Sequence, residues 1–197
     1  MTDQNPRFQA ALERLDALHG EDPRLERTED GEHIPYELLY ARWMSEWLGR
    51  VAPEASEVLQ LAVRAQHLQR WRIPRDDYPR DRPGYLAWRR ELGRRQAETA
   101  AAVLRESGYD QASCEHVAQM IRKERLRSDP DAQALEDSAC LVFLEREFAD
   151  FASRHDDDKL IRILRKTWHK MSPRGHELAA TIGLPPRAQQ LLERALA

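Results

Sequence analysis

The sequence has few cysteines, no long apolar run and no excess of positive charge. Only two of its 197 residues are cysteines, Cys114 and Cys140, which excludes a disulfide framework and a cysteine zinc site. No run approaches the roughly 18 apolar residues of a transmembrane helix, and no basic segment followed by an apolar block indicates a signal peptide. We therefore expect a cytoplasmic protein that does not enter a membrane.

The charge balance and the missing motifs exclude several further classes. The net charge of −3 provides no global attraction to nucleic acid, so any basic surface must be local. The sequence contains no Walker loop, no Gly-x-Gly-x-x-Gly, no Gly-x-Ser-x-Gly and no His-Glu-x-x-His. With 41% hydrophobic and 33% charged residues, the composition is that of a folded globular protein rather than a disordered one.

Amphipathic helical segments, many of them opened by proline, fill most of the chain. Proline is well tolerated at the first helical position, so each such proline marks a start. The predicted helices cover about 6–20, 35–48, 53–71, 85–107, 111–126, 130–155, 156–171, 173–183 and 186–197. Neither strand-length alternation nor an Asn-Gly or Asp-Gly hairpin is present. We predict one all-α domain over residues 1–197, a bundle of eight or nine helices.

Two adjacent acids, Glu136 and Asp137, stand at the head of one of the most apolar runs in the chain. In a helix, Glu136 is in phase with Cys140, and Asp137 is in phase with Leu141. At least one acid should therefore point inward. A buried carboxylate needs a cation, a metal ion or hydrogen-bond donors to compensate it, so this pair is a candidate site.

His67 is the second candidate, because it shares a face of the predicted third helix with Val63 and Trp71. A hydrogen-bonded, half-buried histidine explains the pattern, and so does a metal ligand or a general base. Imidazole and carboxylate together suit divalent ions. If His67 and Asp137 approach within about 4 Å, they can share one ion.

Arginines and aromatic residues alternate in the segment that follows His67. Arginine forks suit phosphate or carboxylate, and aromatic faces suit a ring. The candidates for substrate binding are Arg70, Trp71, Arg75, Tyr78, Trp88 and Arg89. A charged loop pinned by its own aromatic packing is the alternative. Lys166 and Lys170 lie one turn apart on a basic helix face, which either is solvated or clamps a phosphate.

The chain resembles the all-α HD phosphohydrolases in outline. In those enzymes an early helix supplies a histidine, a later helix ends in a His-Asp pair, and a distant helix adds an aspartate. Here Tyr40 stands at the first histidine, His67-Leu68 at the His-Asp pair, and Asp137 at the last aspartate. The resemblance implies a divalent metal site, while Tyr40 and Leu68 leave it either mononuclear or vestigial.

A closer resemblance covers nearly the whole chain. The segments that carry it are Gln66–Arg75, Tyr78-Pro79, Gly84–Arg89, Leu135–Asp137 and Asp158–Ser172. They resemble an uncharacterised family of bacteria and fungi labelled "domain of unknown function" (number forty-two hundred and two). Its members usually have His-Ala-Glu where this chain has Gln96-Ala97-Glu98. The resemblance implies no activity.

Two functional hypotheses follow. In the first, the protein is a metal-dependent hydrolase of a small phosphorylated or nucleotide-like substrate. His67 and Asp137 then hold a divalent ion, and Glu136 or Glu98 completes its shell or acts as general base. In the second, the protein is a non-catalytic binding or regulatory protein. Glu136 or Asp137 then pairs with Arg70 or Lys166 in a buried salt-bridge network without a metal ion, and the arginine and aromatic loop 70–89 contacts RNA or another protein. The oligomeric state is not indicated.

Overall fold

The computed structural model describes residues 5–28, 30–126 and 128–197 and confirms the predicted all-α class. Within these residues there are ten α-helices, slightly more than predicted. Their bounds are α1 Pro6–His19, α2 Tyr36–Val51, α3 Glu57–Arg64, α4 Arg82–Glu106, α5 Gln111–Ile121, α6 Pro130–Val142, α7 Phe148–Ser153, α8 Asp157–Lys170, α9 Pro173–Ala179 and α10 Pro186–Leu196.

Most helices begin where a short polar side chain accepts a hydrogen bond from the first turn. In five helices the capping side chain accepts a hydrogen bond from the backbone N–H three residues further along the chain. These caps are Ser56, Asp81, Asp110, Asp156 and Ser172. Such caps satisfy N–H groups that have no partner within the helix. Proline follows the cap in several helices, as predicted from the spacing of prolines.

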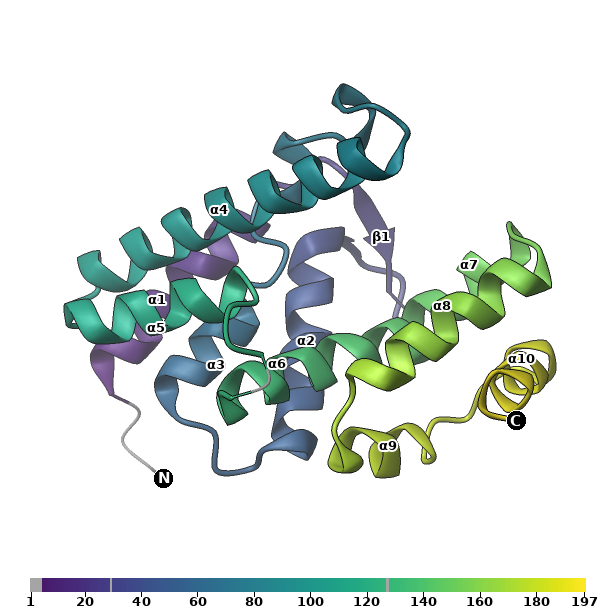
Figure 1. Ribbon diagram of the computed structural model, residues 1–197. Coiled ribbons are helices and arrows are strands. Elements are labelled where there is room, and N and C mark those ends of the chain that lie inside the picture. Colours follow the sequence, from purple (N-terminus) through teal and green to yellow (C-terminus); the bar gives the residue numbers. More distant parts are fainter. Residues whose placement is uncertain (1–4, 29, 127) are drawn as a thin grey trace.

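The helices form a bundle that is elongated in the view of Figure 1. α4 packs along α5 at one end, α8 packs on α10 at the other, and α2 crosses α6 between them (Figure 1). The largest fully buried side chains come from most of these helices and include Leu15, Met44, Leu104, Leu135, Phe148 and Leu160. A second, small cluster of Ile73, Trp88 and Leu92 lies under the segment that joins α3 to α4.

Two local predictions were wrong. Residues 20–33 were expected to form only a loop, but β1 (Leu25–Arg27) pairs antiparallel with β2 (His33–Pro35). Strands of three residues are too short to show a period of two in the sequence. The predicted third helix ends early: α3 stops at Arg64, and His67 adopts a left-handed conformation with φ of 61°. His67 therefore does not share a helix face with Val63 and Trp71.

The predicted helix 130–155 is continuous, but it changes winding in the middle. α6 passes into a π-helical segment, η3 (Phe143–Glu147), and then into α7. A π segment inserts an extra residue into the turn and rotates the side chains that follow it. Two short 3₁₀ turns, η1 (Arg70–Arg72) and η2 (Arg75–Asp77), lie between α3 and α4.

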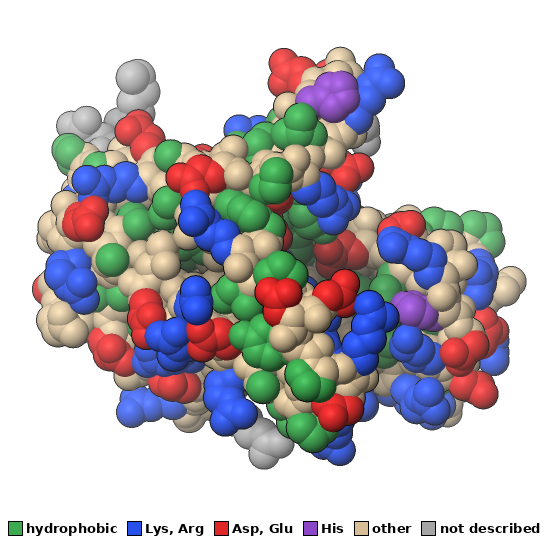
Figure 2. All heavy atoms as spheres, turned by 90° about the horizontal axis from the view of Figure 1, so that it is seen from above, with side chains coloured by type: hydrophobic (Ala, Val, Ile, Leu, Met, Phe, Trp, Pro, Cys, Tyr) green, Lys and Arg blue, Asp and Glu red, His purple; other side chains and the backbone are tan. Residues whose placement is uncertain are grey.

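The surface carries charges of both signs. Figure 2 shows basic and acidic side chains mixed over the face seen from above. None of the described helices is both long and apolar enough to cross a membrane.

Two glycines, one in a close backbone contact and one without neighbours, allow the helix packing to be tested. A Cβ at Gly84 would lie 2.2 Å from the carbonyl oxygen of Pro79, whereas a Cβ at Gly49 would meet nothing within 4 Å. We expect Gly84→Ala to lower the free energy of unfolding by about 1–3 kcal/mol, because the backbone must shift. Gly49→Ala should raise it by up to about 1 kcal/mol, because alanine is the better helix former. Urea unfolding of both variants measures this, and a shift of both in the same direction would contradict the packing described.

Candidate functional site

A cavity of about 340 Å³, here called the inner pocket, lies where the hairpin, the start of α2, the turn after α3 and η3 meet. Most of its lining residues are charged or aromatic. They are Asp22, Arg24, Tyr36, Glu37, His67, Arg70, Trp71 and Glu147. The inner pocket thus brings together three residues predicted for the site, His67, Arg70 and Trp71, with five that were not predicted.

Glu37 is the most perturbed acid of the inner pocket. It lies in the first turn of α2, and its backbone N–H donates to the Asp22 carboxylate at 3.0 Å. The residue is only 5% exposed, and its Oε2 has no hydrogen-bond partner in the described part of the chain. Burial raises the pKa of Glu37 to about 8, although the charge of Arg70 acts in the opposite direction. Glu37 is therefore predominantly a neutral acid at pH 7.

His67 lies between Glu37 and a guanidinium. Its ring stacks on Tyr40 with 4.3 Å between centroids, and its Nδ1 lies 3.7 Å from Glu37 Oε2. Nε2 accepts a hydrogen bond from Arg70 Nη1 at 2.9 Å, which places the imidazole proton on Nδ1. Burial, followed by the charges of Arg70 and Arg89, holds the pKa of His67 well below its usual value. The imidazole is thus neutral, and its one lone pair is engaged.

Arg70 is a cation without a carboxylate partner. Its guanidinium binds the neutral His67 ring and lies 5.1 Å from the centre of the Trp88 ring. Among the described residues no carboxylate oxygen lies within 4.0 Å of Arg70 or of Arg89. A half-buried guanidinium in a pocket wall with free N–H donors is suited to a phosphate or carboxylate.

The π segment supplies the acid that reaches the inner pocket from the sixth predicted helix. Glu147, at the end of η3, accepts the hydroxyl of Tyr36 at 2.6 Å. Burial and the charge of Glu147 raise the pKa of Tyr36 well above its usual value, so the hydroxyl keeps its proton and donates. We predicted that Asp137 of this helix would approach His67. Instead Glu147, ten residues further along, lines the inner pocket together with His67.

Asp137 is buried, but its contacts are structural. Its oxygens accept hydrogen bonds from the backbone N–H of Ser172 at 2.8 Å, from the Ser172 hydroxyl and from Gln133 Nε2 at 3.0 Å. Ser172 is the N-cap of α9, so Asp137 joins α6 to the start of α9. The donor set of Asp137 and the engaged lone pair of His67 do not fit the predicted shared ion.

Glu136 is compensated by lysines rather than by a metal ion. Lys123 Nζ lies 2.5 Å from one oxygen and Lys170 Nζ 3.4 Å from the other. Burial alone would raise the pKa of Glu136, but the two ammonium groups lower it below its usual value. Glu136 is therefore ionised and paired. This pairing corresponds to the buried salt bridge of the second hypothesis, although the cations are Lys123 and Lys170 instead of Arg70 or Lys166.

Several other predicted residues have partners that explain them. Glu98 is exposed and pairs with Arg94 at 2.8 Å. Lys166, by contrast, is exposed and has no side-chain partner among the described residues. Arg75 donates to the carbonyl oxygens of Tyr78 and Pro79, and Trp88 Nε1 donates to the carbonyl of Ile73. The arginine and aromatic segment is thus held mostly by its own contacts, which was the alternative reading of that segment.

The signal for Glu37 was present in the sequence but was missed. Glu37 shares the buried stripe of α2 with Tyr40, Ala41, Met44 and Leu48, so it is an acid on an apolar helix face. The same rule that drew attention to Glu136 and Asp137 applies to it.

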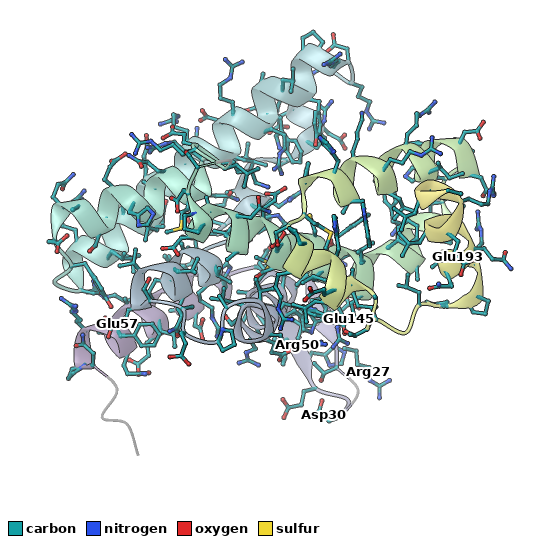
Figure 3. The ribbon with its side chains drawn as sticks, turned by 60° about the horizontal axis from the view of Figure 1, so that its bottom comes forward. Arg27, Asp30, Arg50, Glu57, Glu145 and Glu193 are labelled. Atoms are coloured by element: carbon teal, nitrogen blue, oxygen red, sulfur yellow. The ribbon has the colours of Figure 1, made fainter. Side chains whose placement is uncertain are left out.

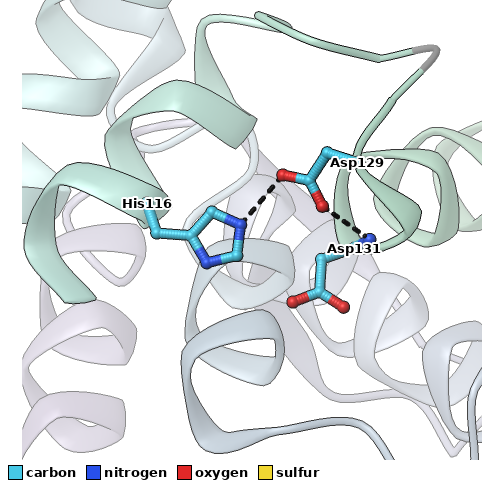
Figure 4. A group of neighbouring side chains, drawn as sticks. All are labelled: His116, Asp129 and Asp131. Carbon is cyan, nitrogen blue, oxygen red and sulfur yellow. Dashed lines mark hydrogen bonds and ion pairs between the residues drawn. The ribbon is translucent and has the colours of Figure 1, made fainter. Parts of the chain in front are cut away.

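One group of metal-ligand type does occur in the described residues, and it does not line the inner pocket. His116, Asp129 and Asp131 each offer a ligand atom, all within 4.8 Å of one another (Figure 4). Asp129 caps α6 through the backbone N–H of Asp131 and binds His116 Nε2 at 2.9 Å. These bonds account for the group, and the positive end of the α6 dipole disfavours a further cation there.

Comparison with known proteins identifies a family but no activity. A family model described as "Domain of unknown function (DUF4202)" matches residues 9–192. No curated protein matches the chain, and no solved structure does.

Proposed function

Because the chain belongs to this DUF4202 family, whose description assigns no activity, we propose a function from the inner pocket: hydrolysis of a small phosphorylated substrate by acid catalysis. Arg70 binds the phosphate. A water molecule attacks phosphorus as the bond to the leaving oxygen breaks, Glu37 donates its proton to that oxygen, and the proton released by the attacking water restores the acid. His67 is a positioning residue between Arg70 and Glu37. The observation that carries the proposal is a buried carboxyl group whose Oε2 has no hydrogen-bond partner in the described chain, in the same pocket as a guanidinium that has no carboxylate partner there.

The carboxyl group of Glu37 has the properties of a general acid. Its pKa of about 8 keeps it protonated at neutral pH, near the value at which proton transfer is most effective. Its side chain lines the inner pocket, and its buried Oε2 makes no hydrogen bond within the described chain. The Nδ1–H of His67, 3.7 Å away, holds the orientation of this oxygen without binding it tightly.

The charges around His67 favour an anion over a metal ion. Arg70, Arg89 and Lys123 all lower the pKa of His67 through their positive charge. The same field repels a divalent cation and attracts phosphate. We therefore do not include the predicted divalent ion in the proposed reaction. Tyr40 and His67 stand at two positions that are metal ligands in the HD phosphohydrolases, and here their rings stack on each other. This contact supports a distant likeness to that layout.

A test of this proposal compares two neighbouring arginines. Inorganic phosphate and phenyl phosphate are titrated into the wild-type protein, Arg70→Gln and Arg72→Gln, with binding followed by NMR and hydrolysis by phosphate release. Arg72 is exposed and pairs with Glu21 at 2.7 Å, so it is the matched control. We expect Arg70→Gln to weaken phosphate binding at least tenfold and Arg72→Gln to leave it unchanged. No binding to the wild-type protein, or equal binding by both variants, would overturn the proposal.

A further inference from the structure

The inner pocket adjoins a larger cavity of about 920 Å³, here called the outer pocket. Arg24, Tyr36 and Glu147 line both cavities, so the two are adjacent, and together they are called the cleft. The outer pocket lies between the β-hairpin, α2, η3 and α7. Its volume is in the range of pockets that hold drug-sized molecules, whereas the inner pocket suits a small group.

One wall of the outer pocket is aromatic. Trp43 of α2 and Phe143 of η3 line it, together with Phe151 of α7 and Tyr36. Phe143 packs edge-on against Phe151 with 6.1 Å between ring centres, and Tyr36 packs edge-on against Trp43 at 6.4 Å. All four rings are partly exposed. Arg24 lies 3.8 Å from the centre of the Tyr36 ring and Arg146 lies 5.4 Å from that of Trp43, so Phe143 and Phe151 are the rings that suit the face of a ring in the substrate.

The charges of the outer pocket do not cancel once its ion pairs are counted. Three of its arginines are held by nearby acids, in the pairs Arg24–Glu26, Arg146–Glu145 and Arg154–Asp150. Among the described lining residues, Glu46, Glu147 and Asp30 remain without a basic partner, against Arg27 alone. Arg27 and Asp30 extend from the hairpin (Figure 3), while Glu147 lies at the junction of the two pockets. The outer pocket is therefore negative and the inner pocket carries the free cation Arg70.

We infer that the substrate of this cleft is zwitterionic: a phosphate at Arg70, a ring against Phe143 and Phe151, and a cationic group facing Glu46 and Glu147. The inference rests on the proposed function, because it takes Arg70 as the phosphate site. A carboxylate beside an aromatic wall stabilises an ammonium group through ion pairing and through the faces of the rings. A phosphate with an apolar tail would leave these acids without a partner.

The experiment compares two isosteric phosphates, 4-(2-aminoethyl)phenyl phosphate and 4-propylphenyl phosphate. They differ only in the end of the chain, which is ammonium in one and methyl in the other. Dissociation constants are measured by calorimetry at low ionic strength, because salt screens exposed pairs. The proteins are the wild type, Glu46→Gln, Glu147→Gln and the control Glu54→Gln, which is exposed and does not line either pocket.

We expect the wild type and Glu54→Gln to bind the amine about tenfold more tightly than the propyl compound, and Glu46→Gln and Glu147→Gln to lose most of that preference. Equal binding of the two compounds by the wild type would overturn the zwitterion inference while leaving the phosphate site at Arg70 intact. A preference that survives in both variants would also overturn it. If neither compound binds, the proposed function fails as well.

Discussion

Replacing Glu37 by Gln is expected to lower the hydrolytic rate constant by about 100- to 10,000-fold, the usual contribution of a general acid or base. Glutamine keeps the shape and the polarity of the protonated acid but has no proton to transfer. Phosphate binding at Arg70 should change little, so the loss should appear in kcat rather than in KM. Steady-state kinetics on the substrate found in the phosphate screen measure the split.

The pH dependence of the activity distinguishes an acid from a base at Glu37. Glu37 acts as an acid, so wild-type activity should fall as pH rises through about 8, where the carboxyl group ionises. This limb should be absent from the residual activity of Glu37→Gln. Activity that instead rises toward pH 8 would assign Glu37 the role of a base and contradict the proposed mechanism.

The contribution of Glu37 to stability should fall over the same pH range as the activity. The pKa of Glu37 is raised from 4.5 in its ordinary state to about 8 in the folded protein, so the folded state binds more protons between these values. The contribution of Glu37 to stability is therefore complete below about pH 4.5 and is lost as pH rises through about 8. Glu37→Gln should be more stable than the wild type above pH 8, which thermal unfolding at several pH values can measure. Glu54→Gln, at an exposed acid that lines neither pocket, is the control.

Replacing Asp137 by Ala is expected to lower the free energy of unfolding by about 3 kcal/mol or more. Hydrogen bonds to a charged group contribute about 1.5–3 kcal/mol each, and Asp137 accepts three, two of them from Ser172. The variant leaves these donors without an acceptor and removes the link between α6 and α9. Urea unfolding followed by circular dichroism measures the loss. A decrease below about 1 kcal/mol would show that the link is not structural.

Gly175 allows the same contact to be tested from the opposite side. A Cβ at Gly175 would lie 2.8 Å from Asp137 Oδ1, so Gly175→Ala should also destabilise the wild type. In the Asp137→Ala background the cost of Gly175→Ala should shrink, because the clashing oxygen is gone. This non-additivity identifies a direct contact. Gly183→Ala is the control, since a Cβ there meets nothing within 4 Å.

The helices were largely predictable because their starts depend on local chemistry. Proline and the capping Ser or Asp act within one turn, so Pro130 and Pro173 marked α6 and α9 correctly. The end of α3 was not predictable in this way. The turn at His67 depends on contacts with Tyr40, Arg70 and Glu37, which are distant in sequence or follow the turn itself. These contacts compensate the cost of a left-handed residue that is not glycine.

The sequence indicated a buried acid in the predicted sixth helix, but not the groups that bind it. The helical phase predicted that at least one of Glu136 and Asp137 points inward, and both are buried. Their partners, Lys123 and Ser172, lie 13 and 35 residues away, and no local pattern indicates them. The position of Glu147 depends on the π segment, which rotates the end of the helix. Periodicity assumes uniform winding, so it could not place Glu147 beside Tyr36.

The hairpin has a consequence for how long a ligand stays in the cleft. β1 and β2 pair over only three residues each, and this sheet has no further strand. Two-stranded hairpins are marginally stable in water, and elements with few buried contacts open at a lower free energy than the core. Arg24 and Tyr36, which flank the hairpin, line both pockets. We therefore expect residence times to follow the local unfolding of the hairpin, seen as fast amide hydrogen exchange in residues 25–35, rather than the strength of the phosphate contact alone.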